Sequence, residues 1–134
     1  MNQKKLGIGV IIQNQNSNFL LHLRDGHTKN MSNQWSLIGG EVEKGEAPIK
    51  AAIREVKEET NLLAKNLTVF TNITFNDKWD AIIFCAQVNS SKQKMILHEG
   101  KKLTFFPKGE MIRFINNLSY TNPFLEVLKK YLNN

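Results

Sequence analysis

Hydrophobic and polar positions alternate in several short segments, and this pattern predicts β-strands. The segments are residues 6–12, 19–24, 35–38, 67–75, 79–88 and 103–106. The first two flank the polar stretch 14–18, so they are predicted to form a hairpin. In the fifth, the run Ile82–Ala86 is apolar on both faces, which indicates a strand in the interior of a sheet.

The two strands of the predicted hairpin have defined faces, because successive side chains of a strand point to opposite sides. In residues 6–12 we expect Ile8, Val10 and Ile12 on one face and Ile11 on the other. In residues 19–24 the two faces are Phe19, Leu21 and Leu23, and Leu20, His22 and Arg24.

Three prolines are predicted to open helices, since the first helical turn does not need the missing N–H. The first helix begins at Pro48 and ends near residue 60. Its apolar positions recur at three- and four-residue steps and are predicted to face a core; they are Ile49, Ala52, Ile53, Val56 and Thr60. Helices opened by Pro107 and Pro123 are predicted to end near residues 114–115 and 132. The buried side predicted for the last helix is Phe124, Leu125, Leu128 and Leu132.

Composition and length fit one globular domain over residues 1–134, with 41% hydrophobic and 22% charged residues. The single cysteine excludes an internal disulfide framework and favours a reducing, cytoplasmic compartment. No stretch approaches the length of a membrane span. Periodicity alone leaves the fold class as α+β or α/β.

The first predicted helix carries acid on one flank of its apolar stripe. Glu55, Glu58 and Glu59 lie on that flank, while Lys50, Arg54 and Lys57 lie on the other. Like charges three or four residues apart destabilise a helix by roughly 0.2–0.5 kcal/mol per pair. A solvated face is the ordinary explanation for two glutamates. The three together, with Glu46 before the helix, favour instead a site for a hard cation such as Mg²⁺, which prefers oxygen ligands.

These residues have the spacing of a known signature. Gly40, five residues, Glu46, seven residues and then Arg54-Glu55-Val56-Lys57-Glu58-Glu59 resembles the signature of the Nudix hydrolases. One fixed position differs, since Asn61 stands where the family has glycine, before the expected apolar Leu62. Asparagine also accepts the left-handed conformation that closes a helix. The resemblance implies an α/β fold in which a mixed β-sheet is sandwiched between helices.

The resemblance also implies which residues form the active site. It assigns metal ligands to Glu55, Glu58, Glu59 and the Gly39 carbonyl, for Mg²⁺ with Mn²⁺ as a substitute. Arg54 would hold the carboxylates in place, and Glu46 would stabilise the loop before the helix. Glu55 and Glu99 are both candidates for the general base, and Glu99 is equally well explained as a surface glutamate.

Candidates for substrate binding lie outside the acidic helix. Arg24 lies where some relatives contact phosphate, Gly40 lets backbone approach a ligand closely, and Trp79 is the better of the two tryptophans for stacking on a base. Trp35 is expected in the core. MutT-like members have lysine after the double glycine, whereas this chain has Glu41. The remaining candidates, His22, His27 and His98, lack metal-ligand spacing, and we assign them no role.

We therefore expect a compact, MutT-like Nudix pyrophosphohydrolase that uses Mg²⁺ to cleave a nucleoside triphosphate or another nucleoside diphosphate derivative. The net charge of +6 keeps RNA 5′-pyrophosphate removal as an alternative. A nucleotide-sensing module without turnover is another, although it would not need the glutamates. The partner is a small nucleotide, with no membrane, and the chain is expected to be a monomer or a homodimer.

Overall fold

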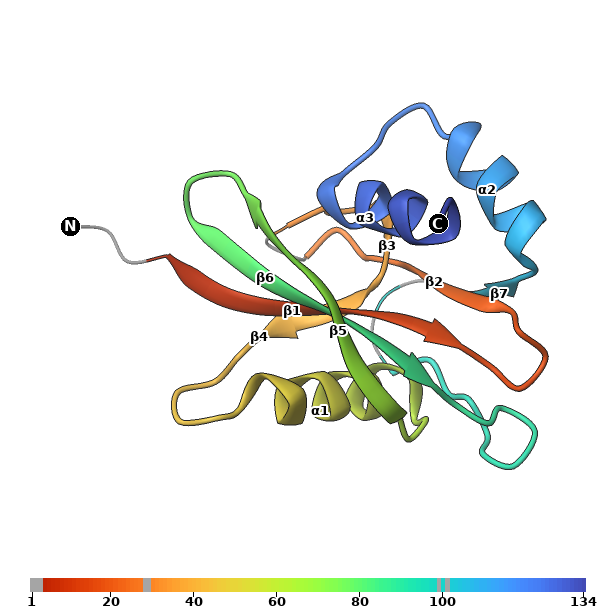
Figure 1. Ribbon diagram of the computed structural model, residues 1–134, viewed down its shortest axis with the longest axis horizontal. Coiled ribbons are helices and arrows are strands. Elements are labelled where there is room, and N and C mark those ends of the chain that lie inside the picture. Colours follow the sequence, from red (N-terminus) through yellow and green to blue (C-terminus); the bar gives the residue numbers. More distant parts are fainter. Residues whose placement is uncertain (1–3, 28–29, 99, 101) are drawn as a thin grey trace.

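The computed structural model describes residues 4–27, 30–98, 100 and 102–134, and its strands form one mixed sheet with helices on both faces (Figure 1). The strands are β1 (Lys5–Gln13), β2 (Phe19–Leu23), β3 (Trp35–Ser36), β4 (Ile38–Glu41), β5 (Lys65–Phe75), β6 (Trp79–Gln87) and β7 (Lys102–Phe106). The helices are α1 (Pro48–Thr60), α2 (Lys108–Asn116) and α3 (Pro123–Leu132). The predicted α/β sandwich is confirmed.

One edge of β1 has a single partner strand, and its other edge is shared by two strands. On one side β1 pairs in parallel with β6 along its whole length, and β6 carries β5 on its far edge. On the other side residues 7–10 of β1 pair with β4, whereas Gln13 pairs with Phe19 of β2. The chain changes partner at Leu37, since β3 before it pairs with β2 and β4 after it pairs with β1. β6 is therefore an interior strand, as its apolar run predicted.

The two faces of the sheet bury separate hydrophobic clusters. Ile8, Val10 and Ile12 of β1 pack with the buried residues of α1, while Ile11 packs with residues of α2 and α3. The predicted alternation of β1 is thus confirmed, and it explains how one strand serves both layers. Figure 1 shows α1 on one side of the sheet and α2 with α3 on the other.

Helix α1 begins at Pro48 and ends before Asn61, which adopts the left-handed conformation with φ 67°. Both boundaries agree with the sequence, but the buried side differs. Ile49 is 41% exposed and Ala51 is fully buried. The side facing β1 and β4 is rotated toward Ala51 and Glu59, where alanine side chains let the helix lie close to the sheet.

The double glycine also differs from expectation. Gly39 and Gly40 lie inside β4, opposite Gly9 and Ile8 of β1, rather than in a loop. The turn to α1 follows from residue 42. The sequence at this point suggested a loop because glycine is depleted in strands, but close packing on both faces excludes larger side chains here.

Helices α2 and α3 begin after Pro107 and at Pro123, as predicted, and Phe124, Leu125, Leu128 and Leu132 are buried. Asn122 caps α3 by accepting a hydrogen bond from the Leu125 N–H at 2.9 Å. Within the described ranges, no helix has the length and apolar character needed to cross a membrane.

Candidate active site

Glu55 and Glu59 of α1 line a cavity of about 460 Å³ between the helix, the end of β2 and β4. We call it the acidic cavity. Its other lining residues are His22, Arg24, Asp25, Gly39, Gly40, His98 and Gly100. The side chain of Glu59 is only 4% exposed and that of Glu55 is 13% exposed. Two of the three glutamates on the acidic flank of the helix therefore face a cavity rather than open solvent.

Glu55 and Glu59 lie one helical turn apart on α1, and both side chains are largely buried where they line the acidic cavity. Burial raises the pKa of Glu55, and the hydrogen bond donated by Arg54 offsets only part of that rise. Two largely buried carboxylates on neighbouring turns of one helix repel each other when both are ionised, and a proton or a cation relieves that repulsion. The pair therefore has the donor chemistry of a hard-cation site.

The third predicted ligand is placed differently. Glu58 is half-exposed and turns its Oε2 toward Arg54 at 3.2 Å. Across the described ranges of the chain, no three acidic, histidine or cysteine side chains converge on one metal position. Mg²⁺ often uses one or two protein carboxylates and keeps water and substrate phosphate as its other ligands. Glu55 and Glu59 fit that kind of binding.

Arg54 ties the acidic residues to the preceding loop. Its Nε and Nη2 donate to both carboxylate oxygens of Glu46, at 2.8 and 3.0 Å. Its Nη1 donates to Glu55 Oε1 at 2.8 Å and to Glu58 Oε2 at 3.2 Å, and its Nη2 also donates to the Glu41 carbonyl. These bonds raise the pKa of Arg54 and lower that of Glu46. One planar guanidinium thus connects β4, the loop and α1.

The absence of a side chain on Gly40 provides the space that the Glu55 carboxyl group occupies. A Cβ atom on Gly40 would overlap the Glu55 carboxyl group, so any other residue there would displace it. The neighbouring Gly39 points to the opposite face of the sheet, where an added Cβ would meet Phe124 and the Ile8 carbonyl. The glycine pair therefore borders two different cavities, one on each face of β4.

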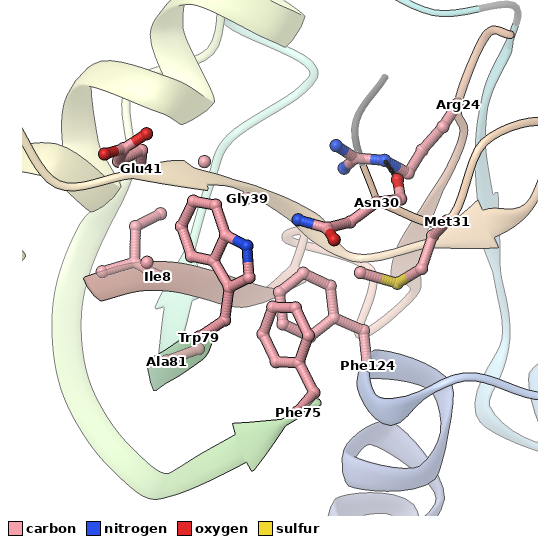
Figure 2. Close-up of a pocket in the computed structure, with 12 residues that line it drawn as sticks. Ile8, Arg24, Asn30, Met31, Gly39, Glu41, Phe75, Trp79, Ala81 and Phe124 are labelled. Atoms are coloured by element: carbon pink, nitrogen blue, oxygen red, sulfur yellow. Dashed lines mark hydrogen bonds between the residues drawn. The ribbon is translucent and has the colours of Figure 1, made fainter. Parts of the chain in front are cut away.

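The cavity on the opposite face measures about 250 Å³ and is lined by aromatic rings (Figure 2). We call it the aromatic pocket. Trp79 and Phe75 are parallel, with ring centroids 6.1 Å apart and an interplanar angle of 2°. Phe124 meets Phe75 edge-on at 5.8 Å, and the amide of Asn30 lies beside the rings (Figure 2). The pocket offers flat apolar surface with a polar group at its side.

The acidic cavity and the aromatic pocket share Arg24, Gly39 and Gly40. Arg24 follows β2, and its Nε donates to the Asn30 carbonyl at 3.1 Å. Because successive residues of β4 face opposite sides, the two cavities meet around this short strand. A single ligand could therefore place one part in each.

The structure brings most of the predicted site residues to these cavities. Glu55, Glu59, Gly39, Gly40 and Arg24 line the acidic cavity, and Trp79 lines the aromatic pocket. Glu99 lies outside the described residues. Trp35 is half-buried away from both cavities, edge-on to Phe114 at 5.2 Å.

Sequence reasoning missed several lining residues. His22 and His98 received no role, yet both line the acidic cavity. For His22 a signal existed, since it shares a strand face with Leu20 and Arg24. Phe75, Phe124 and Asn30 of the aromatic pocket come from three distant segments, and no local pattern links them.

Comparison with known proteins decides the family, since the sequence matches the NUDIX domain over residues 3–124. The chain belongs to the NUDIX domain family. The resemblance seen in the Gly40–Glu59 signature is thereby confirmed.

Relatives of this Nudix protein include the 8-oxo-dGTP diphosphatase of Escherichia coli K12, which is 35% identical over 75 residues. That match covers 54% of this chain and 56% of the enzyme. The m7GpppN-mRNA hydrolase NUDT17 of Xenopus laevis is 39% identical over 57 residues, which are 42% of this chain and 19% of that protein. The chain thus spans little more than half of the first relative and a fifth of the second.

Solved structures share the whole fold of this Nudix protein. The MutT protein from Methanosarcina mazei Go1 superposes with a TM-score of 0.75 at 19% identity. The superposition covers 98% of this chain and 94% of that one. At this identity the likeness establishes the fold alone.

Proposed function

We propose that this Nudix protein hydrolyses a pyrophosphate bond in a nucleoside triphosphate or another nucleoside diphosphate derivative, by attack of water on phosphorus. The observation that carries the proposal is the meeting of the acidic cavity and the aromatic pocket at Arg24, Gly39 and Gly40. A nucleotide joins a flat aromatic base to a charged phosphate chain. The two cavities provide surroundings suited to each part.

The acidic cavity is proposed to take the phosphate chain together with Mg²⁺, for which Mn²⁺ can substitute. Glu55 and Glu59 would supply carboxylate oxygens, with Glu58 and the Gly39 carbonyl as further ligands. When bound, such a cation polarises phosphoryl oxygens and acidifies water. Arg54 keeps Glu55 and Glu58 oriented through its hydrogen bonds. Glu55 and Glu99 remain the two candidates for the general base.

The aromatic pocket is proposed to take the base, stacked against Trp79 (Figure 2). Asn30 presents an amide that can donate and accept hydrogen bonds at the edge of a base. Arg24 lies in both cavities and is proposed to contact the phosphate next to the sugar.

The relatives reduce the number of candidate substrate classes only in part. The Escherichia coli relative is named for a nucleoside triphosphate, which favours that class. Glu41, however, lines the aromatic pocket where MutT-like members have lysine. The side chain at this position therefore has the opposite charge, so the nucleotide pose of MutT-like members does not carry over directly. We therefore keep triphosphates and other nucleoside diphosphate derivatives as joint candidates, acting in the cytoplasm.

A screen of nucleotides tests this proposal. Nucleoside triphosphates, nucleoside diphosphate sugars, dinucleoside polyphosphates and ADP-ribose are incubated with Mg²⁺, and products are resolved by ³¹P NMR. We expect release of a nucleoside monophosphate from at least one class, and its loss on chelation. Tight binding with no turnover across the panel would instead identify a nucleotide sensor.

Removal of pyrophosphate from RNA 5′ ends is a second candidate, favoured by the net charge of +6 and by the relative named as an mRNA hydrolase. Triphosphorylated RNA is added to the panel to test it. If RNA is the substrate, activity on it should fall steeply between about 50 and 200 mM salt, because phosphate contacts release counterions. Activity on free nucleotides that exceeds activity on RNA at every salt concentration would exclude it.

A further inference from the structure

His22 is a buried histidine beside the acidic cluster that the proposed mechanism does not use. It lies in β2 with its Nδ1 3.5 Å from Glu59 Oε1. The two side chains are only 3% and 4% exposed. Both line the acidic cavity. A histidine–carboxylate contact this deep is therefore part of the wall that faces the proposed cation.

The imidazole ring is fixed from several sides. The backbone of His22 pairs with Ser36 of β3 and with Leu103 of β7, so its position in the sheet is set on both edges. Gly100, with φ +87°, packs against the ring, and a Cβ atom there would overlap His22 Nε2. The ring consequently has little freedom to swing away from Glu59.

The backbone of Glu59 is fastened as well. Its carbonyl accepts a hydrogen bond from the His98 N–H at 3.3 Å, and the neighbouring Thr60 carbonyl accepts one from the Ile96 N–H at 2.9 Å. The Asn61 side chain also donates to the Lys94 carbonyl. Residues 94–98 are thus bound to the end of α1, while Gly100 packs against His22.

We propose that His22 is a positioning residue. It holds the Glu59 carboxylate in the orientation in which that group and Glu55 both face the acidic cavity. A glutamate has three rotatable side-chain bonds, so an unsupported carboxylate would sample several directions. Nδ1 is the imidazole nitrogen on the Glu59 side, 3.5 Å from Oε1, and a shift of a few tenths of an ångström would bring it to hydrogen-bond distance. The inference rests on the proposed function, because it concerns the orientation of a proposed cation ligand.

Three substitutions of His22 distinguish a positioning role, which needs a polar N–H, from a role in packing alone. His22→Asn places an amide N–H near the position of Nδ1, His22→Gln moves the amide toward the position of Nε2, and His22→Leu removes the polar group. Binding of Mn²⁺ alone is measured by electron paramagnetic resonance, with urea unfolding and steady-state kinetics on the same samples. Glu59→Gln is measured in parallel.

We expect His22→Leu and His22→Gln to weaken Mn²⁺ binding by roughly 10–100-fold, the usual effect of losing a residue that orients a metal ligand. Their kcat should fall more than their KM rises. His22→Asn should stay within a few-fold of the unsubstituted protein in both measurements. If His22→Leu does not fold, the contrast between the asparagine and glutamine variants gives the same test.

Equal Mn²⁺ affinity in all three His22 variants would overturn the inference. The inference would also fail if the loss of Mn²⁺ affinity in each variant followed its loss of unfolding free energy, and not the absence of an N–H donor at the Nδ1 position. Either outcome would overturn only the role of His22, and leave the proposed function standing, if Glu59→Gln loses Mn²⁺ binding in the parallel measurement. Unchanged Mn²⁺ affinity and turnover in Glu59→Gln would instead contradict the proposed function.

Discussion

Arg54 makes more polar contacts than a lysine could make. Its guanidinium donates to Glu46, Glu55, Glu58 and the Glu41 carbonyl at the same time. A lysine ammonium carries its three N–H donors on one nitrogen and cannot reproduce this planar arrangement. Even a conservative substitution of Arg54 should therefore disturb the candidate site.

Arg54→Lys should lower activity by roughly 10–100-fold, because Glu55 and Glu58 lose the group that orients them. The measurement is kcat/KM on the best substrate of the panel, with Arg113→Lys on the exposed side of α2 as the matched control. Equal activity in the two variants would show that Arg54 acts by charge alone.

Gly40→Ala should abolish most activity, since the new Cβ atom would overlap the Glu55 carboxyl group and force it out of place. Gly109→Ala is the matched control, because the nearest atom to a Cβ there is 3.8 Å away. Because Gly109 lies in the first turn of α2, that control should change the free energy of unfolding by less than about 0.5 kcal/mol. Thermal unfolding and turnover are measured for both, and full activity in Gly40→Ala would refute the close contact.

The candidate site was only partly predictable at this scale. The spacing of Glu55, Glu58 and Glu59 identified the acidic side of α1, because helix geometry relates sequence distance to position. It could not show that Glu59 would be buried and Glu58 half-exposed, since that depends on how α1 is rotated against β4. Contacts between distant segments, such as His22 with Glu59, have no local signal in the sequence.

Among the elements, α3 connects the C-terminal part of the chain to β3. The Asn122 side chain accepts from the Leu125 N–H and donates to the Trp35 carbonyl and to Gln34 Oε1, both at 3.0 Å. One buried amide thus caps the helix and joins it to the strand that leads into β4. Loss of this residue should loosen the wall of the aromatic pocket, which α3 supplies through Phe124.

Asn122→Ala should destabilise the protein by about 0.5–2 kcal/mol, the usual effect of losing an N-cap. Urea unfolding measures the change, and Asn116→Ala on the exposed side of α2 should change stability by less than about 0.5 kcal/mol. Indistinguishable midpoints for the two variants would contradict the capping role.

Element boundaries were predicted well where a residue fixes the backbone. Pro48, Pro107 and Pro123 marked the helix starts, and Asn61 marked the end of α1. Ile49 was wrongly expected in the core because periodicity gives a stripe but not which edge of it meets the sheet. The partition of residues 35–41 into β3 and β4 was missed, since it arises from the change of partner at Leu37.

At the scale of the whole molecule, the division of the sheet beside β1 creates the site. β4 stands between α1 on one face and the aromatic pocket on the other, and Arg24, which follows β2, lines both cavities. Strand order was not predictable from the sequence, because pairing between distant strands depends on packing of the entire chain. The presence of two cavities therefore had to come from the structure.

Trp79→Ala should raise KM roughly 5-fold to 150-fold, because stacking a base on an aromatic ring contributes about 1–3 kcal/mol. The kcat should change less, since Trp79 lies on the face of the sheet opposite to the glutamates. Trp79→Phe keeps a ring and serves as the control. A fall in kcat with KM unchanged would show that the base does not bind there.

The central claim is that Glu59 helps to seat a divalent cation needed for pyrophosphate hydrolysis. The most direct measurement is turnover of the best nucleotide substrate by the unsubstituted protein and by Glu59→Gln across a Mg²⁺ series, with circular dichroism to confirm folding. The account predicts activity that rises and saturates with Mg²⁺, and a folded variant about 100-fold slower or worse. Turnover unaffected by chelation, or equal in the two proteins, would contradict it.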